Sequence, residues 1–306
     1  MTKSGRPYRA FTAGSWWNTR VPEDVSLNAD NEAILSYLST APESGSGCLT
    51  LAGAGGSPWG QPIYWARPTD REYDVGGMTT GRPREFERLR IPAGTRAAAN
   101  SDGSLTIFDL DKGYVALLTD AAYDGENDEW SASGATVTYL RSNGLHALTG
   151  RSDDARNTGT HRGNNGATVA VRWDMVKAGV VNHVLKAASG PALANRSEFP
   201  MVGSDGDYEG TDAAVPPQGV RLRIKPSVDL KSLGLHPQAL VIARALQRYG
   251  FYFGDSSGVT ALKLEDTRAE GRGQLWDVTS EDLCGLPFTP DYWDVLPPGY
   301  DPSERR

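Results

Sequence analysis

The sequence contains few of the residues that usually build metal sites. It has only two cysteines and four histidines among 306 residues. Two cysteines cannot form a structural zinc site unaided, and four scattered histidines do not form a recognisable ligand pattern. We therefore expect neither a metal nor another cofactor. Cys48 and Cys284 lie far apart in the chain, and they form either one disulfide or two buried thiols.

Long apolar runs are also missing. No segment approaches the ~20 consecutive apolar residues of a membrane span, and the first residues, MTKSGRPYRAFTAGSWWN, lack the apolar core of a signal peptide. These absences predict a soluble protein with no signal peptide and no membrane insertion. The formal net charge of -7 argues against nucleic acid or an anionic membrane as the main partner, because both favour a basic patch.

Short catalytic motifs are absent as well. The chain has no G-x-S-x-G elbow, no phosphate-binding loop, no H-E-x-x-H pair and no dinucleotide fingerprint. The absence of these motifs excludes few classes of enzyme, because carbohydrate-active β-sandwiches rarely carry short motifs.

Glycine and proline, by contrast, are abundant. The 35 glycines and 19 prolines indicate many short elements separated by turns. Strand patterns with turn signals every roughly 8–12 residues predict a mainly β protein, with residues 1–306 forming a single β-sandwich or jelly-roll-like domain with a few short helices. Residues 1–22 are expected to form an extended N-terminal arm, and the proline- and aromatic-rich residues 281–306 a C-terminal strap.

Local patterns predict individual elements. Helical spacing and capping residues predict helices at 31–40 and 237–249, with one helical turn at 174–177. Strands are expected at 61–66, 105–110, 114–118, 135–140, 167–171, 180–185, 220–224, 251–253 and 259–264. Turn residues join 105–118 and 251–264 into hairpins. The alternation in 220–224 predicts one wet and one buried face. The arginine-rich segment 67–90 is expected to be a solvated loop rather than an anion site.

Candidate site residues concentrate between Thr160 and Gly206. His183 lies in an apolar run, so it is either a core histidine bonded to a carbonyl or an acid/base group that projects from a sheet. His161 and Arg162 lie in a loop rich in glycine and asparagine, where they are expected to be exposed and could bind a carboxylate or a sugar hydroxyl. Asp205 is either a turn residue or a catalytic carboxylate.

Further acidic and aromatic candidates lie earlier in the chain. Asp109 ends an apolar strand, where its side chain can face a cleft, and Glu129 stands beside Trp130. Glycosidases need two carboxylates roughly 5–10 Å apart, and aromatic rings stack on sugars. Asp109, Glu129, His183 and Asp205 are therefore catalytic candidates, and Trp130, His161 and Arg162 are substrate-binding candidates. Of the eight tryptophans, those in predicted loops favour carbohydrate contact, although core packing explains most tryptophans. These loop residues are Trp16, Trp17, Trp59 and Trp130.

Three segments together carry a family resemblance. They are Tyr8 with Phe11-Thr12-Ala13-Gly14-Ser15-Trp16-Trp17-Asn18-Thr19, then Val180-Val181-Asn182-His183-Val184-Leu185 followed by Ser204-Asp205-Gly206, and Ala243-Arg244-Ala245-Leu246-Gln247-Arg248-Tyr249-Gly250. The chain resembles a group of actinobacterial secreted β-sandwich proteins whose relatives include minor tail proteins of actinobacteriophages. Asn182-His183 matches the place of a histidine in such sequences. Met201-Val202-Gly203 departs from the histidine-containing approach expected before Ser204, which puts a catalytic histidine pair in doubt.

The resemblance implies a minor tail protein at the tail tip or in a fibre. Such a protein is made in the host cytoplasm, assembles with other tail proteins or further copies of itself, and contacts host cell-wall polysaccharide during adsorption. The first alternative is an enzyme, a hydrolase or lyase that degrades the cell-wall glycan. The second alternative is a purely structural tail component.

Overall fold

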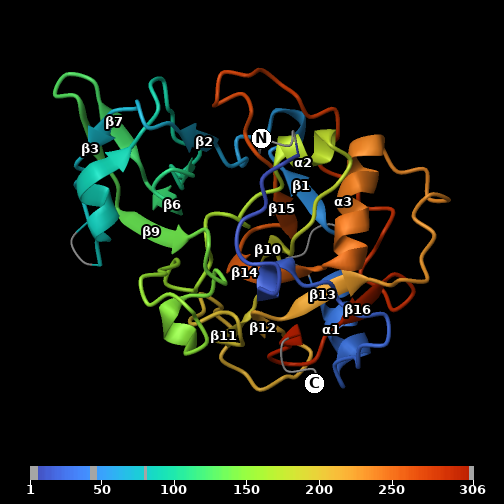
Figure 1. Cartoon of the computed structure of the whole chain (residues 1–306). Helices are drawn as coiled ribbons and strands as arrows, with labels where there is room; N and C mark the ends of the chain where they lie inside the picture. The colour runs from blue at the N-terminus through green and yellow to red at the C-terminus, as the bar shows by residue number, and fades with distance from the viewer. Residues whose placement is uncertain (1–5, 42–46, 79–80, 303–306) are drawn as a thin grey trace.

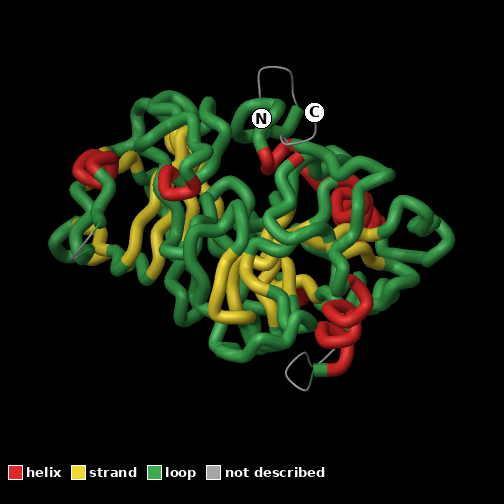
Figure 2. The backbone as a smooth tube through the Cα atoms, turned by 90° about the horizontal axis from the view of Figure 1, so that it is seen from below, coloured by secondary structure: helices red, strands yellow, loops and turns green. Residues whose placement is uncertain are grey.

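The computed structural model describes residues 6–41, 47–78 and 81–302 (Figure 1). The protein is mainly β, with several sheets and a few short helices. Figures 1 and 2 show most strands gathered in two groups, which are a six-stranded and a four-stranded sheet. Three two-stranded ribbons complete the β structure: β3 (Glu72–Tyr73) with β4 (Leu89–Arg90), β7 (Ala122–Asp124) with β8 (Glu129–Ser131), and β11 (Ala194–Ser197) with β12 (Pro217–Gln218).

The six-stranded sheet is mixed and open. Its order is β1-β15-β10-β14-β13-β16. The strands are β1 (Thr50–Ala52), β10 (Leu185–Ser189), β13 (Arg221–Ile224), β14 (Phe251–Ser256), β15 (Ala261–Lys263) and β16 (Trp293–Val295). Two neighbouring pairs are parallel, β1 with β15 and β10 with β14, and the other pairs are antiparallel.

The four-stranded sheet has the order β2-β5-β6-β9. Its strands are β2 (Ile63–Ala66), β5 (Leu105–Asp109), β6 (Tyr114–Thr119) and β9 (Gly134–Tyr139). The predicted hairpin over 105–118 is confirmed, with Ile107 opposite Ala116. The strands expected at 61–66 and 135–140 are also present. These local predictions hold because residues that favour turns directly adjoin apolar, strand-forming segments.

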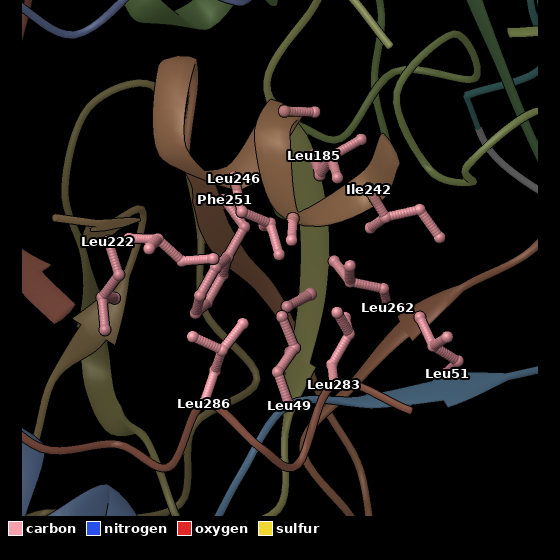
Figure 3. Close-up of a cluster of buried hydrophobic side chains, with 14 of the residues drawn as sticks. Leu49, Leu51, Leu185, Leu222, Ile242, Leu246, Phe251, Leu262, Leu283 and Leu286 are labelled. Atoms are coloured by element: carbon pink, nitrogen blue, oxygen red, sulfur yellow. The ribbon is translucent and has the colours of Figure 1, made fainter. Parts of the chain in front are cut away.

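Helices cover the six-stranded sheet. Both predicted helices are confirmed, as α1 (Asn31–Thr40) and α3 (Pro237–Arg248), and the helical turn is α2 (Trp173–Lys177). The 3-10 turns are η1 (Trp16–Asn18), η3 (Ala54–Gly56), η4 (Arg84–Arg88) and η5 (Ala147–Thr149). Ile242 and Leu246 of α3 belong to the same buried apolar cluster as Leu185 and Phe251 of the sheet (Figure 3).

The hairpin predicted over 251–264 is wrong, although both of its strands exist. Strand β10 lies between β14 and β15, so the two predicted partners do not pair. Ala187 of β10 is opposite Phe253 on one side and Leu262 on the other. A sequence window that contains β14 and β15 cannot reveal a third strand that enters from more than 60 residues away.

Two other strand predictions require correction. Residues 167–170 form turns, because the Asn165 side-chain oxygen accepts the backbone N–H groups of Ala167 at 3.0 Å and Thr168 at 3.1 Å. The strand predicted at 180–185 begins only at Leu185. Before it, the Val184 N–H donates to the Trp17 carbonyl at 2.7 Å, so this backbone joins the N-terminal arm instead of a sheet.

The prediction of a wet face on β13 is also wrong. All four residues of this strand are buried, and Arg221 and Arg223 are only 1% and 2% exposed. The N-terminal arm covers them, because Arg221 Nη2 donates to the Thr19 carbonyl at 3.0 Å and Arg223 Nη1 to the Pro22 carbonyl at 2.6 Å. Arg223 also pairs with Asp294 at 3.0 Å.

Both terminal segments pack on the body of the protein. The C-terminal strap contains β16, which adds to the edge of the sheet beside β13, and Cys284 in the strap forms a disulfide with Cys48. Among the described residues, no helix is long and apolar enough to span a bilayer. The mainly β prediction is confirmed, but the sheets are open and the jelly-roll arrangement is not confirmed.

Candidate functional site

A large cavity lies between residues of the two main sheets and has a volume of about 1350 Å³. One wall comes from β1, β10, β14 and β15 of the six-stranded sheet. The facing wall comes from β6 and from the turns that precede β5 and follow β6. We call this cavity the cleft. Its size is in the range of sites that take small molecules or segments of polymers.

Strand alternation makes the cleft wall polar. In β10, Leu185 and Ala187 face the apolar core, so Lys186 points to the opposite side and lines the cleft. In β15, Leu262 faces the core and Lys263 faces the cleft. The sheet therefore has one face against α3 and one face that carries two lysines into the cavity.

An ion-pair network crosses this wall. Lys186 Nζ lies 2.6 Å from Asp255 Oδ2, and Arg162 Nη2 lies 3.1 Å from Asp255 Oδ1. Arg162 also pairs with Asp205, which accepts further hydrogen bonds from Gln218 and from Ser256. The loop that carries Arg162 is thus bound to the end of β14, and its guanidinium group is held at the cleft wall.

The network shifts the pKa values of its members. Burial by itself would raise the pKa of Asp255, but the positive charges of Lys186 and Arg162 outweigh it and lower that pKa to about 2. Burial, helped by the neighbouring Lys186 charge, lowers the pKa of Lys263. Asp255 is therefore an ionised acceptor at neutral pH, whereas Lys263 gives up its proton more readily than an ordinary lysine.

A second ion pair joins the two walls. Lys263 Nζ of β15 lies 3.3 Å from Asp102 Oδ2, which belongs to the turn before β5. The Asp102 carbonyl accepts the Asp120 N–H at 2.6 Å, so this turn is tied to the end of β6. The pair links the two sheets at the cleft.

Trp59 is the exposed aromatic residue at the cleft. Its side chain lines the cavity, and the residue is 45% exposed. The tight turn that carries it is anchored, because Asn100 donates to the Pro58 carbonyl at 2.9 Å and Arg268 to the Ser57 carbonyl at 2.7 Å. Gly60 must be glycine, since an added Cβ would lie 2.9 Å from the Cβ of Asp266. The ring is thus presented by a rigid turn.

The remaining lining is rich in hydroxyl groups and balanced in charge. Three cations, Arg162, Lys186 and Lys263, accompany three carboxylates, Asp102, Asp120 and Asp255. Hydroxyl side chains in the lining include Thr50, Ser104, Thr119, Thr160, Ser256 and Ser280. Such a surface offers donors and acceptors in equal measure, which suits a ligand covered with hydroxyl groups.

The structure brings two of the predicted site residues together. Arg162 and Asp205 form an ion pair, and Arg162 lines the cleft while Asp205 lies directly behind it. Arg162 was expected to be exposed, but its side chain is only 15% exposed because Asp205 and Asp255 enclose it. Its neighbour His161 is exposed, as predicted, and partial burial with the adjacent Arg162 charge lowers its pKa.

His183 and Asp109 lie elsewhere and are both buried. His183 is 4% exposed, with Nδ1 2.7 Å from the Val184 carbonyl oxygen. This contact is the one expected of a core histidine. Asp109 is fully buried and accepts the N–H groups of Asp111 and Lys112 at 3.1 and 2.8 Å, so it caps the turn between β5 and β6. Neither residue lines the cleft.

Glu129 and Trp130 lie on the small β7–β8 ribbon. Glu129 is exposed to solvent, whereas Trp130 is 5% exposed and packs with its ring centroid 5.2 Å from that of Tyr123. Trp16 and Trp17 are buried too. Of the four tryptophans expected in loops, Trp59 is the one that presents its ring at the cleft.

Lys186, Lys263 and Asp255 were not among the site residues predicted from the sequence. The two lysines interrupt apolar strands at positions whose neighbours are buried, which is the signal that could have identified them. Asp255 was assigned to a turn, and only the tertiary structure places it between Lys186 and Arg162.

Metal binding has no support in the part of the chain that the structure describes, where no cluster of three or more histidine, cysteine or acidic side chains could hold an ion. Comparisons of the chain with protein-family models, with curated proteins and with solved structures found no match.

Proposed function

We propose that the cleft binds polysaccharide and that the protein is a phage minor tail protein that contacts host cell-wall polysaccharide during adsorption. The observation that carries the binding proposal is Trp59, an exposed ring on a rigid turn beside a hydroxyl-rich, charge-balanced cleft. Aromatic faces stack on sugar rings, and paired charged groups hydrogen-bond sugar hydroxyls. The tail setting rests on the sequence resemblance.

The disulfide fits this setting. Disulfides persist in oxidising surroundings and are rare in the cytoplasm. A bond between Cys48 and Cys284 suits a protein that works at the outer envelope of a host cell. A purely structural tail component could carry the same bond, so the binding experiment separates these two roles.

Binding is better supported than cleavage. The catalytic candidates do not converge, because Asp109 and His183 are buried away from the cleft and Glu129 lies on a separate ribbon. Asp205 is held behind Arg162. We therefore expect arabinogalactan fragments to bind without the release of new reducing ends. An increase in reducing ends with the wild-type protein would favour the enzyme alternative.

The test compares Trp59 variants in calorimetric titrations with arabinogalactan oligosaccharides. Trp59→Ala should weaken binding by at least about fivefold, because stacking alone contributes roughly 1 kcal/mol. Trp59→Phe should retain most of the affinity. Leu148→Ala, which removes a side chain that is 78% exposed and outside the cleft lining, is the matched control. Wild-type protein that failed to bind these oligosaccharides, or unchanged affinity in Trp59→Ala, would contradict the proposal.

A further inference from the structure

A second cavity is lined by arginines. It has a volume of about 470 Å³, and its lining includes Arg6, Arg9, Arg20 and Arg248 together with Tyr249. We call it the arginine pocket. No carboxylate side chain is among its described lining residues, although the whole chain has a net charge of -7. The like charges of Arg9, Arg20 and Arg248 around one cavity repel each other, so the site favours an anion.

Many arginines outside this pocket pair with carboxylates. In the arginine-rich segment 67–90, Arg84 pairs with Glu85, Arg88 with Glu72, and Arg90 with Asp111. Within the residues that the structure describes, Arg9, Arg20 and Arg248 have no such partner. Arg20 Nε donates a hydrogen bond to the Tyr249 hydroxyl at 3.5 Å.

Nearby backbone groups do not take the place of an anion. The pocket adjoins the C-terminal end of α3, where unpaired carbonyl groups would carry negative charge. Here the Arg248 carbonyl accepts the Val21 N–H at 2.9 Å, and the Tyr249 carbonyl accepts Arg221 Nε at 2.8 Å. These carbonyls already accept hydrogen bonds from other groups, so they do not occupy the guanidinium groups of Arg20 and Arg248.

We propose that the arginine pocket binds a phosphate monoester of sugar-phosphate size. A phosphate group carries up to two negative charges and three acceptor oxygens, which can engage more than one guanidinium fork, whereas a single carboxylate matches one fork. The volume exceeds what a phosphate alone needs, and Val180 and Tyr249 add apolar surface for the attached group. The pocket shares no lining residue with the cleft, so this proposal does not depend on polysaccharide binding there.

The test is calorimetric titration of the full chain at low ionic strength with glucose 6-phosphate, inorganic phosphate, glucuronate and glucose. Glucose 6-phosphate should bind and glucose should not. Arg20→Gln and Arg248→Gln should each weaken this binding by about tenfold, the size expected for one charged hydrogen bond. Both side chains are exposed, so the variants should fold, which circular dichroism and thermal unfolding would verify.

The matched control is Arg196→Gln, which removes an exposed arginine of β11 outside the pocket and should leave the affinity unchanged. Inorganic phosphate that binds as tightly as glucose 6-phosphate would identify free phosphate as the source of the same chemistry. The proposal is overturned if no phosphate compound binds at millimolar concentration, if glucuronate or glucose binds equally well, or if both pocket variants keep full affinity.

Discussion

At the scale of single residues, burial decides the chemistry of the charged side chains. Alternation in 220–224 predicted one solvent-exposed face for this strand. Arg221 and Arg223 nevertheless both lie buried under the N-terminal arm. They are tolerated in the interior because backbone carbonyls accept hydrogen bonds from Arg221 Nε and Nη2, and Asp294 pairs with Arg223. Arg162 follows the same rule at the cleft, where Asp205 and Asp255 compensate its charge.

His183 gives a prediction about pH. Burial lowers the pKa of His183 to about 4, below its value of roughly 6.5 in an unfolded chain. Between these values the unfolded chain binds more protons than the folded protein, so the free energy of unfolding falls as the pH drops from about 6.5 to 4. The contribution of this one residue is at most roughly 3 kcal/mol.

The measurement is urea unfolding of the wild type and of His183→Gln at pH 7 and pH 5. The variant starts from lower stability because a packed side chain changes, but it should lose less stability between the two pH values than the wild type. Equal losses in both proteins would show that His183 does not produce this pH dependence.

At the scale of elements, the junction between α3 and β14 depends both on local helix signals and on packing against β13. Helix spacing and the proline at the first turn predicted α3 correctly, and its actual N-cap is the side chain of His236, which accepts the Gln238 N–H at 3.3 Å. Gly250 ends the helix with φ of 70° and begins the approach to β14. A Cβ at this position would collide with the backbone carbonyl of Leu222 in β13.

Gly250→Ala should therefore destabilise the protein by more than the strain of a positive φ alone, which costs roughly 1 kcal/mol. Gly179→Ala is the matched control, because Gly179 has φ of 75° and no atom within 4 Å of an added Cβ. Thermal unfolding of both variants measures the difference. A Gly250→Ala variant no less stable than Gly179→Ala would show that β13 moves aside at little cost.

At the scale of the whole molecule, the Cys48–Cys284 disulfide joins the start of the six-stranded sheet to the C-terminal strap across a sequence separation of 236 residues. A cross-link of distant residues restricts the unfolded chain, and its loss typically costs about 2–5 kcal/mol. We predict that a reducing agent lowers the guanidinium midpoint of the wild type. The double variant Cys48→Ser with Cys284→Ser should match the reduced protein and should not respond to the reducing agent. A response of that variant would assign the effect to something other than the disulfide.

The cleft is also a property of the whole molecule. Its charged residues come from the turn before β5, the loop at Arg162, and strands β10, β14 and β15. Lys186 and Asp255 are 69 residues apart in the sequence, and Lys263 and Asp102 are 161 residues apart. Such pairs leave no pattern in any short window, which is why the candidate site named from the sequence contained only Arg162 and Asp205 of this network.

The sequence by itself determined the mainly β character, helices α1 and α3, the β5–β6 hairpin and strand β9. The reason is that hydrophobic periodicity and the preferences of turn residues depend on only a few neighbouring residues. Only the tertiary structure decided that β10 separates β14 from β15, that the arm buries the β13 arginines, and that the lysines of β10 and β15 face one cleft with Trp59. The physical reason is distance along the chain. Strand pairing and charge compensation join segments whose local sequences are independent of each other, so they exist only once the chain has folded.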